Sequence, residues 1–588
     1  AIVMGTLEVD GTIVLATHGT GNGTIVNDNG INFAASNVGG NLNATATLGN
    51  ITESGTDALT VTGTSTFTTS ASDADITLAT TTNAFTGAVS LNTTGGDGNA
   101  EIYPGTTNLV FGTSSVGGNL TVTTGSGSAV TQTGVLTVDG ATDITANDGG
   151  TNIRLEGQEN VLTGAVSLDG WNVRLTNAKA LELDTIDSRA LVLTARGAIT
   201  QTVPSVITSV GSSTITAQNS AGNTDYDVTL ENAANDFRGA LILTAGNVRV
   251  RDTDDVELGA STVSGTYKLT AGGAVSDSGD LDIEGATTIL ASGSNVVLDR
   301  ATHDFTGAVE VEGAAVELVD ANAIDLGTST VSGTYAVTAT AGGDITDSGV
   351  LAITGAATFT AAGGQSITLD SNNTFDDTSN AGATDAAVTF AAVSGNLKNV
   401  TVKDSDEFDL VALTLAQVSS AGGNLTVTAG GKLTDGGALV IPGTTTITAT
   451  GQEVDLDHTS NNFATITFGS STNAVASVEV VDTNAIDIGA SKSTGNFTVT
   501  AGGDVTDSGT ITVGGDLYAT TDANNGDITL NQLAVASGKT IALTTNDSAN
   551  DNTGHATVVN ANAVKLAASS VDGNLSVTAS AGNITQSG

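Results

Sequence analysis

The chain has 588 residues, and its 62 acidic side chains against 16 basic ones give a formal net charge of −46 at pH 7. This charge repels the phosphates of nucleic acids and the anionic surfaces of membranes, so it argues against both as partners. The chain contains no cysteine, which excludes disulfide bonds and thiolate metal sites. Only 3% of the residues are aromatic while 74 are glycine, so the chain can fill only a narrow core with small aliphatic side chains.

The sequence predicts no membrane-spanning helix, because it contains no run of eighteen apolar residues. Its first residues also lack the basic, apolar and small-residue succession of a secretory signal. We therefore expect any export signal to lie outside these residues.

Internal repetition is the main feature of the sequence. A closing segment rich in Gly, Asn and Thr, such as GGNLTVTAGGKLTDGG at 422–437, returns about every 70 to 80 residues with the same order of residue types. Such a period is typical of solenoids, in which each repeat stacks on its neighbours. Counted by this segment, the approximate repeats are 1–55, 56–134, 135–202, 203–279, 280–349, 350–437, 438–509 and 510–588.

Two further motifs keep a fixed order within each repeat. One starts with Asp or Asn and runs into a short apolar segment, as in DANAIDLG at 320–327 and DTNAIDIG at 482–489. The other contains Asn or Asp, then an aromatic residue or Leu, then Gly, and we expect its aromatic side chain to be an isolated core residue about 14 Å from its counterparts. A sugar-stacking platform is the alternative for that side chain. This aromatic motif occurs at 83–87, 160–164, 236–239 and 304–307.

Short apolar alternations, such as those at 309–311 and 324–326, are bounded by Gly, Asn, Asp or Ser and predict half-buried β-strands. Tandem immunoglobulin-like sandwiches would need a thick core, aromatic anchors and linkers, and the chain shows neither anchors nor linkers. A parallel β-helix needs only small inward side chains and turns that admit Gly, Asn and Asp. We therefore predict an all-β parallel β-helix solenoid that runs through 1–588, with about three rungs in each repeat of 70 to 80 residues.

The segment GGNLTVTAGG at 422–431, followed by a short apolar strand and another Gly, resembles the repeats of filamentous haemagglutinin-type adhesins and of giant bacterial β-strand-repeat surface proteins. The resemblance covers nearly the whole chain. It implies a right-handed β-helix, export to the cell surface, and a role in adhesion, cell-cell contact or sheath formation. The Asn-Pro-Asn signatures of that family's secretion domain are missing, since the prolines are Pro104, Pro204 and Pro442, so no export route is assigned.

No residue pattern points to catalysis or to a cofactor. Acidic clusters at 252–255, 404–407 and 455–458 are expected from so acidic a composition, and we predict that they form solvated turns. A Gly-x-Ser-x-Gly nucleophile motif is absent. A polysaccharide lyase or hydrolase is therefore the least favoured function. The four histidines are scattered among the repeats and are expected at the surface, and they are His18, His303, His458 and His555.

Calcium is the metal that this composition could bind, because aspartates at alternate positions in turns present hard oxygen ligands. The candidate ligands are Asp73 with Asp75 and Asp404 with Asp406. The tandem calcium-roll nonapeptide is absent.

Asn-x-Ser/Thr triplets also recur in the closing segment. We expect their asparagines to adopt left-handed backbone angles at the entry to a strand rather than to carry glycans. The triplets include those that begin at Asn119, Asn424 and Asn574.

These patterns predict a structural, extracellular rod or filament segment of a giant surface protein, which serves as a stalk, sheath or adhesive fibre. Its expected partners are other copies, end to end or laterally, or flanking repeats of the same chain. The alternative is an adhesin that binds surface glycans or a protein through irregular inserts, near 376–385 and 95–99.

Overall fold

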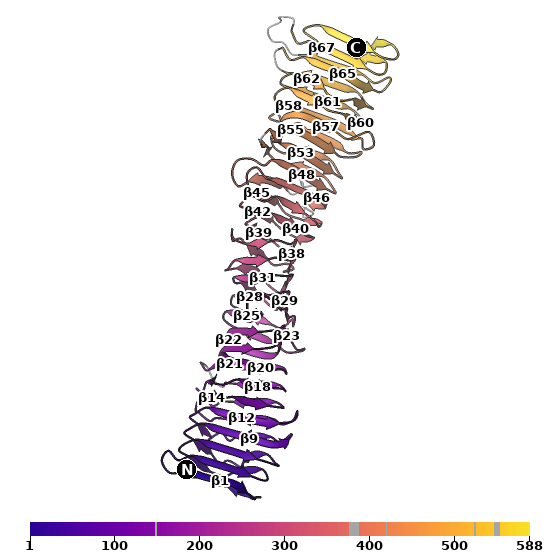
Figure 1. Ribbon diagram of the computed structural model, residues 1–588. Coiled ribbons are helices and arrows are strands. Elements are labelled where there is room, and N and C mark those ends of the chain that lie inside the picture. The colour runs from indigo at the N-terminus through magenta and orange to yellow at the C-terminus, as the bar shows by residue number, and fades with distance from the viewer. Residues whose placement is uncertain (147–149, 376–386, 419, 523–524, 546–552, 588) are drawn as a thin grey trace. The chain divides into compact units, whose positions relative to one another are not determined.

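The structure, a computed structural model, describes residues 1–146, 150–375, 387–418, 420–522, 525–545 and 553–587 (Figure 1). These residues form short β-strands joined by turns, without a helix among them. Two compact units, Ala1–Leu290 and Ala291–Gly588, are built in the same way. The described part of the chain therefore contains no helix long and apolar enough to cross a membrane.

Strands form where side chains alternate between the interior and the solvent. In β32 (Tyr267–Ala271), residues 267, 269 and 271 are buried while 268 and 270 are turned outward. Inward positions carry Val, Leu, Ile and Ala, and outward ones mostly carry Thr, Ser or Asp. Because side chains alternate with a period of two along a strand, this pattern separates one buried face from one solvated face.

In the first unit, each strand pairs with a strand of the next rung, where a rung is one full turn of the solenoid. The pairing is parallel, and equivalent apolar residues such as Val250, Leu269 and Ile289 meet in register. One such stack consists of β23 (Ile199–Gln201), β26 (Val228–Leu230), β29 (Val248–Asp252), β32 and β35 (Thr287–Leu290).

The second unit stacks its strands in the same manner. Leu318, Val337, Phe359 and Phe390 follow one another in register through four rungs. The stack that contains them consists of β36 (Val296–Leu298), β39 (Val316–Asp320), β42 (Tyr335–Ala339), β45 (Ala357–Ala361) and β47 (Val388–Ala392). A later stack consists of β58 (Ser477–Asp482), β61 (Phe497–Ala501), β64 (Leu517–Thr521) and β66 (Ile541–Thr545).

The chain is therefore an all-β parallel β-solenoid of about 27 rungs with about 21 residues in each, and a repeat of about 70 residues supplies about three rungs. The predicted fold class is confirmed. Tandem sandwiches would require antiparallel sheets. Among the described residues, paired antiparallel strands occur only in the small hairpin of β51 (Gln417–Val418) and β52 (Ala421–Gly422).

The longest strands of the first unit run around corners of the solenoid. They are β20 (Asn152–Leu162), β21 (Val166–Asn177) and β22 (Leu181–Ala195), which pair in parallel in this order. In these rungs one continuous strand contributes to two faces of the solenoid. Most other rungs use separate short strands joined by turns.

The aromatic residues of the aromatic motif lie in the core, as predicted, since Phe85, Phe237 and Phe305 are at most 1% exposed. Their burial excludes the sugar-stacking alternative for these rings. The expected isolation is wrong for Phe85, whose ring lies 6.0 Å from that of Phe67 in an edge-to-face arrangement. Phe67 in turn meets Phe33 at 6.4 Å. The interior is so narrow that rings from different faces touch across it.

Glycines of the closing segment allow successive rungs to approach closely. A Cβ atom on Gly39 would lie 1.7 Å from the carbonyl oxygen of Gly19, on the rung before. The φ angle of Gly39 is not in the left-handed region, so the glycine is needed for space rather than for an unusual backbone angle.

We expect Gly39→Ala to lower the free energy of unfolding by about 2 kcal/mol or more, because backbone atoms of two rungs must separate to admit the methyl group. Gly11→Ala is the matched control, since a Cβ atom there meets nothing within 4 Å. Thermal denaturation followed by circular dichroism measures both variants. Equal stability of the two variants would contradict this role of Gly39.

Candidate functional site

In four repeats, three polar side chains lie on successive rungs, and they come from the three sequence motifs. The first is the Gln or Asp near the end of the closing segment. The second is an Asn two residues before the aromatic residue or Leu, and the third is the Asn or Asp that begins the second motif. We call such a set a polar triad. The described triads are Gln132–Asn160–Asn177 and Gln201–Asn235–Asp252 in the first unit, and Asp347–Asn373–Asp404 and Asp435–Asn461–Asp482 in the second.

The first and second members of a triad bond to each other. Gln201 Nε2 donates to Asn235 Oδ1 at 2.7 Å, and Asn235 Nδ2 donates back to Gln201 Oε1 at 2.9 Å. In the second unit an aspartate takes the place of the glutamine. Asp435 Oδ2 then accepts a hydrogen bond from Asn461 Nδ2 at 2.5 Å. Two rungs are thus joined through side chains in addition to the backbone ladder.

The central asparagine also holds the backbone of the preceding rung. Asn235 Oδ1 accepts from the Ile207 N–H at 3.0 Å, and Asn461 Oδ1 accepts from the Leu439 N–H at 2.9 Å. Each of these asparagines is 0% exposed. An unpaired backbone N–H in the interior would destabilise the fold. The side-chain amide of the buried asparagine therefore stabilises it by accepting a hydrogen bond from an N–H that has no partner within the strand ladder.

The third member completes the set with two backbone bonds. Asp252 Oδ2 accepts from the Phe237 N–H at 2.7 Å, and Asp252 Oδ1 accepts from the Asp254 N–H two residues further on, at 2.8 Å. Asp482 bonds in the same way to the N–H groups of Phe463 and Asn484. An aspartate that bonds the N–H two residues ahead forms an Asx turn. This explains why the second motif opens with Asp or Asn.

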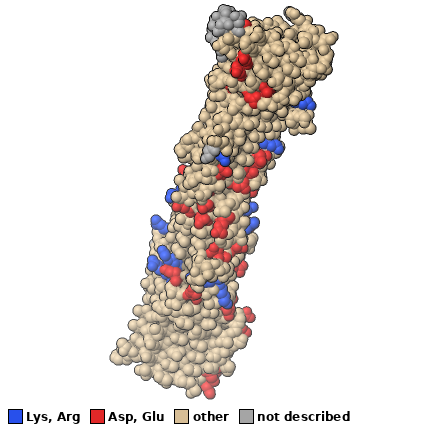
Figure 2. Space-filling model, turned by 45° about the horizontal axis from the view of Figure 1, so that its top comes forward, with Lys and Arg blue, Asp and Glu red and all other residues tan. Residues whose placement is uncertain are grey.

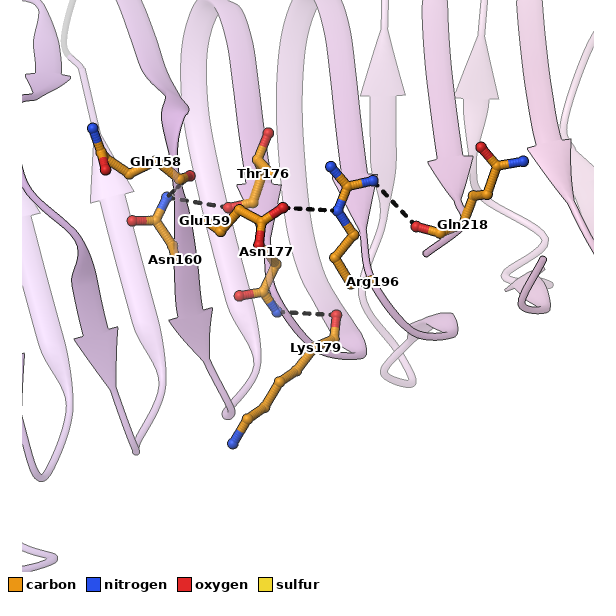
Figure 3. A network of polar contacts seen from close by, with 8 residues as sticks. All are labelled: Gln158, Glu159, Asn160, Thr176, Asn177, Lys179, Arg196 and Gln218. Atoms are coloured by element: carbon orange, nitrogen blue, oxygen red, sulfur yellow. Dashed lines mark hydrogen bonds and ion pairs between the residues drawn. The ribbon is translucent and has the colours of Figure 1, made fainter. Parts of the chain in front are cut away.

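The triad of Gln132, Asn160 and Asn177 contains no carboxylate, and Figure 3 shows its surroundings. Asn160 Nδ2 donates to the carbonyl oxygen of Thr176 at 3.2 Å, and Asn177 Oδ1 accepts from the Leu162 N–H at 2.9 Å. Nearby, Arg196 forms an ion pair with Glu159 at 3.1 Å. That pair is partly exposed to solvent, so it adds little stability.

Burial changes the acidity of the carboxylates in the triads. Desolvation raises the pKa of Asp435 from 3.8 to about 6, although hydrogen bonds from Asn461 and His458 oppose the shift. Asp320, which occupies the third position of its repeat, is raised to about 6 for the same main reason. Burial also raises the pKa values of Asp252, Asp347 and Asp482. These carboxylates therefore destabilise the fold when they ionise, because the interior solvates their charge poorly.

The acidic clusters are only partly solvated, which corrects one prediction. Asp252 and Asp404 are 3% and 2% exposed, because each leads a cluster as the third member of a triad. The following residues, such as Asp254 and Asp406, are exposed as predicted. In the cluster at 455–458, Asp457 is exposed and Asp455 is half-buried.

The surface location predicted for all four histidines is wrong for His303, which is 0% exposed. It lies two residues before Phe305, where other repeats have the central asparagine, and its ring lies 5.6 Å from that of Phe305. His18 is exposed, while His458 and His555 are half-buried. The sequence could have predicted this burial, because His303 occupies the position of the buried asparagine in the aromatic motif.

The candidate calcium ligands lie in two different settings. Asp73 is exposed and Asp75 is half-buried, and Asp75 Oδ1 accepts from the Asn99 N–H at 2.8 Å. Asp404 instead uses its two oxygens for the N–H groups of Phe375 and Asp406. Within the described ranges no three His, Cys, Asp or Glu side chains are grouped so that they could hold a metal. Calcium binding at these residues stays a prediction.

The asparagines of the closing segment do not have the left-handed backbone angles that we predicted. The described non-glycine residues with positive φ are Asp73, Ser420 and Asn525. Asn119 Oδ1 and Asn424 Oδ1 instead accept from the N–H of the equivalent position on the next rung, each at 2.8 Å. These asparagines form an outer ladder of side-chain to backbone bonds, which is why the same residue type recurs.

The two inserts suggested for partner binding differ in what the structure describes. The insert at 376–385 lies outside the described residues. Gly95–Asn99 forms a tight turn with a φ of +90° at Gly95, and its Asn99 belongs to the outer ladder, since Asn99 Oδ1 accepts from the Asn119 N–H.

We expect Asn461→Ala to lower the free energy of unfolding by about 2 to 4 kcal/mol, because the Leu439 N–H and the Asp435 carboxylate lose their partner in the interior. Asn462→Ala is the matched control, since this neighbouring asparagine is half-exposed on the outer side of the strand. Chemical denaturation compares the two variants. A loss of similar size in both would show that the triad does not act as described.

We expect the stability of the protein to fall as the pH rises from about 4 to about 7, in part because of Asp320 and Asp435. Their folded pKa values of about 6 lie above the unfolded value of 3.8, so their contribution is complete below pH 4 and is lost as they ionise. Asp435→Asn should remove up to about 3 kcal/mol of this decline. Asp139→Asn, at an exposed site in the first unit, should leave the decline unchanged. Denaturation midpoints measured across this pH range decide the matter, and identical profiles for Asp435→Asn and the parent would contradict it.

Eight segments of the chain match one known family of repeats, whose description is "Repeats of unknown function (DUF5649)". Neither the curated proteins nor the solved structures contain a match. The matched residues are 20–92, 97–169, 170–244, 245–312, 313–382, 397–468, 474–545 and 553–588. Since these segments span most of the sequence and their length corresponds to about three rungs, the chain belongs to this family of repeats of unknown function.

Proposed function

We propose that this chain is a structural segment of an extracellular rod or filament, in which it serves as a stalk or spacer. The observation that carries the proposal is the polar triad. Side chains that could perform chemistry elsewhere are used here for backbone groups of neighbouring rungs. The same bonds recur in the first unit at Asn235 and in the second at Asn461.

A solenoid of this kind suits a spacer because its length follows from the number of repeats. Parallel strands stack at about 4.8 Å, so about 14 rungs in one unit extend for about 65 Å. Each rung bonds to its neighbours only, so stability accumulates along the stack. Length can therefore change by whole repeats without a new core.

The composition of the surface supports exposure to solvent outside the cell. Outward strand positions carry Thr, Ser and Asp, and acidic and basic side chains are interspersed on the face seen in Figure 2. A large negative net charge keeps such a chain soluble and discourages lateral aggregation of its sheets. The extracellular location rests on the resemblance to bacterial surface repeats.

Association with further rungs of the same fold is part of the proposal. In the last described rung, β69 (Leu575–Ala579) and β70 (Ile584–Gln586) present Leu575 and Ile584, which are 45% and 52% exposed. These residues are in register with Ala556 and Val564, which are buried. Apart from these residues, each rung pairs in parallel with the next, as β29 does with β32, so a rung of a second copy or of flanking repeats can add to a stack in the same way.

We expect deletion of residues 97–169, one matched repeat, to shorten the particle by about 14 Å, the height of three rungs, and to leave its melting temperature nearly unchanged. Deletion of residues 99–118 removes a single rung between two equivalent asparagines and is the control. It breaks the three-rung order of the triads and should lower the melting temperature. Small-angle scattering gives the length and circular dichroism gives the melting temperature.

Two outcomes would contradict the proposal. One is a deletion of 97–169 that unfolds the remaining chain, because repeats would then not be interchangeable spacers. The other concerns a protease added to intact cells. If the chain resists this protease completely before lysis but is degraded by it after lysis, the segment does not lie outside the cell.

A further inference from the structure

Trp171 departs from the repeat pattern in both size and placement. It is the single tryptophan of the chain, and it is 40% exposed. The largest fully buried side chains are Phe and Tyr residues of the interior. Trp171 lies at a corner of the solenoid within β21, and its backbone N–H donates to the Thr151 carbonyl oxygen at 2.6 Å. Neither the core nor a polar triad requires an indole at this place.

The residues next to Trp171 on the following rungs also project outward. Gly170 is in register with Ser188, which is in register with Ser209. Residues 171, 189 and 210 therefore follow one another up the same corner. The guanidinium carbon of Arg189 lies 4.8 Å from the centre of the Trp171 ring, and Val210 is 52% exposed. The cation-π contact favours this orientation of the indole.

A hollow lies beside this indole. Its lining includes Trp171, Arg189 and Val210, together with Gly150 and Gly170. Gly150 leaves open space at the hollow, because a Cβ atom there would meet nothing within 4 Å. A hollow with an aromatic wall and a few polar groups is suited to a small ligand.

Two carboxylates flank the hollow. Asp169 and Asp187 are in register on adjacent strands, both are exposed, and both line the hollow. Burial and the nearby Asp187 and Asp143 raise the pKa of Asp169. A ligand that donates hydrogen bonds to these carboxylates without carrying negative charge would relieve their repulsion.

We propose that Trp171, Asp169, Asp187 and Arg189 form a binding site for a neutral saccharide. The apolar face of a sugar ring packs against the indole, sugar hydroxyls donate to the two carboxylates, and Arg189 donates to a sugar oxygen. The acidic pair repels anionic sugars. A basic peptide is less suited, because the positive charge of Arg189 repels a lysine or arginine that approaches the ring. The site adds a binding role to the spacer and does not depend on it.

The single tryptophan makes the site directly observable, because the indole fluorescence of the protein comes from Trp171 alone. The probes are maltohexaose, cellohexaose and N-acetylchitohexaose, titrated at millimolar concentrations into the intact chain. We expect at least one of them to change the emission of Trp171 and to give a matching dissociation constant by calorimetry. No change with any of the three probes overturns the proposal.

Variants test the residues by calorimetry. Trp171→Ala should weaken binding at least about tenfold, and Asp169→Asn combined with Asp187→Asn should also weaken it. Tyr518→Ala is the matched control, because Tyr518 is an aromatic side chain in the second unit with the same 40% exposure. Circular dichroism confirms that each variant folds, and Trp171→Phe retains an aromatic ring if the alanine variant is unstable. Equal affinity of Trp171→Ala and Tyr518→Ala overturns the proposal.

Two further probes decide the ligand class. Oligogalacturonate should bind more weakly than the neutral sugars, and equal or tighter binding contradicts the assignment to a neutral saccharide. A lysine-rich peptide that binds in a manner sensitive to Trp171→Ala, while the sugars do not bind, would identify a peptide site instead. The length measurement on the repeat deletion stays valid in either case, so the two proposals fail independently.

Discussion

The structure depends on hydrogen bonds between adjacent rungs. The most important are those at the corners, in which a side-chain oxygen accepts a hydrogen bond from a backbone N–H. Within a strand, the parallel ladder satisfies the backbone by itself. At the corners, where the chain passes from one strand to the next, a backbone N–H in or near the interior would otherwise have no hydrogen-bond acceptor. Asn235 accepts such a group from Ile207, and Asp252 accepts one from Phe237. The need arises on adjacent rungs, where different side chains meet it, and Ser261 accepts in the same way from the Leu243 N–H. The set of accepting side chains returns after about three rungs.

This constraint explains why so acidic a chain buries some of its aspartates. A carboxylate accepts two N–H groups well, and Asp482 uses one oxygen for Phe463 and the other for Asn484. Desolvation opposes ionisation at the same time, which raises the pKa of Asp482. Asn177 meets the same need without a charge. The exchange of Asp and Asn among repeats shows that hydrogen bonding, rather than charge, is what the position requires.

In a repeated structure, residues that maintain the fold can be distinguished from residues that depart from the repeat pattern. Residues that recur in several repeats, such as Asn119 and Asn424, bond to the next rung and have a structural role. Trp171 occurs once, is held by Arg189 and lies beside a hollow. For a chain whose family carries no assigned activity, such departures are the places where a binding function can be sought.

The sequence by itself determined the solenoid, because a period of two within strands and a longer period between motifs leave few other all-β arrangements. It also determined that Phe237 and Phe305 are buried, since an apolar residue in a repeated strand position faces the core. It did not determine that Asp252, Asp404 and His303 are buried, because a turn residue can point toward either side. The two aspartates are turned inward by backbone N–H groups of the neighbouring rung, and His303 packs against the ring of Phe305. The pairing of Gln201 with Asn235 joins residues 34 positions apart, and only the stacking of one rung on the next brings them together.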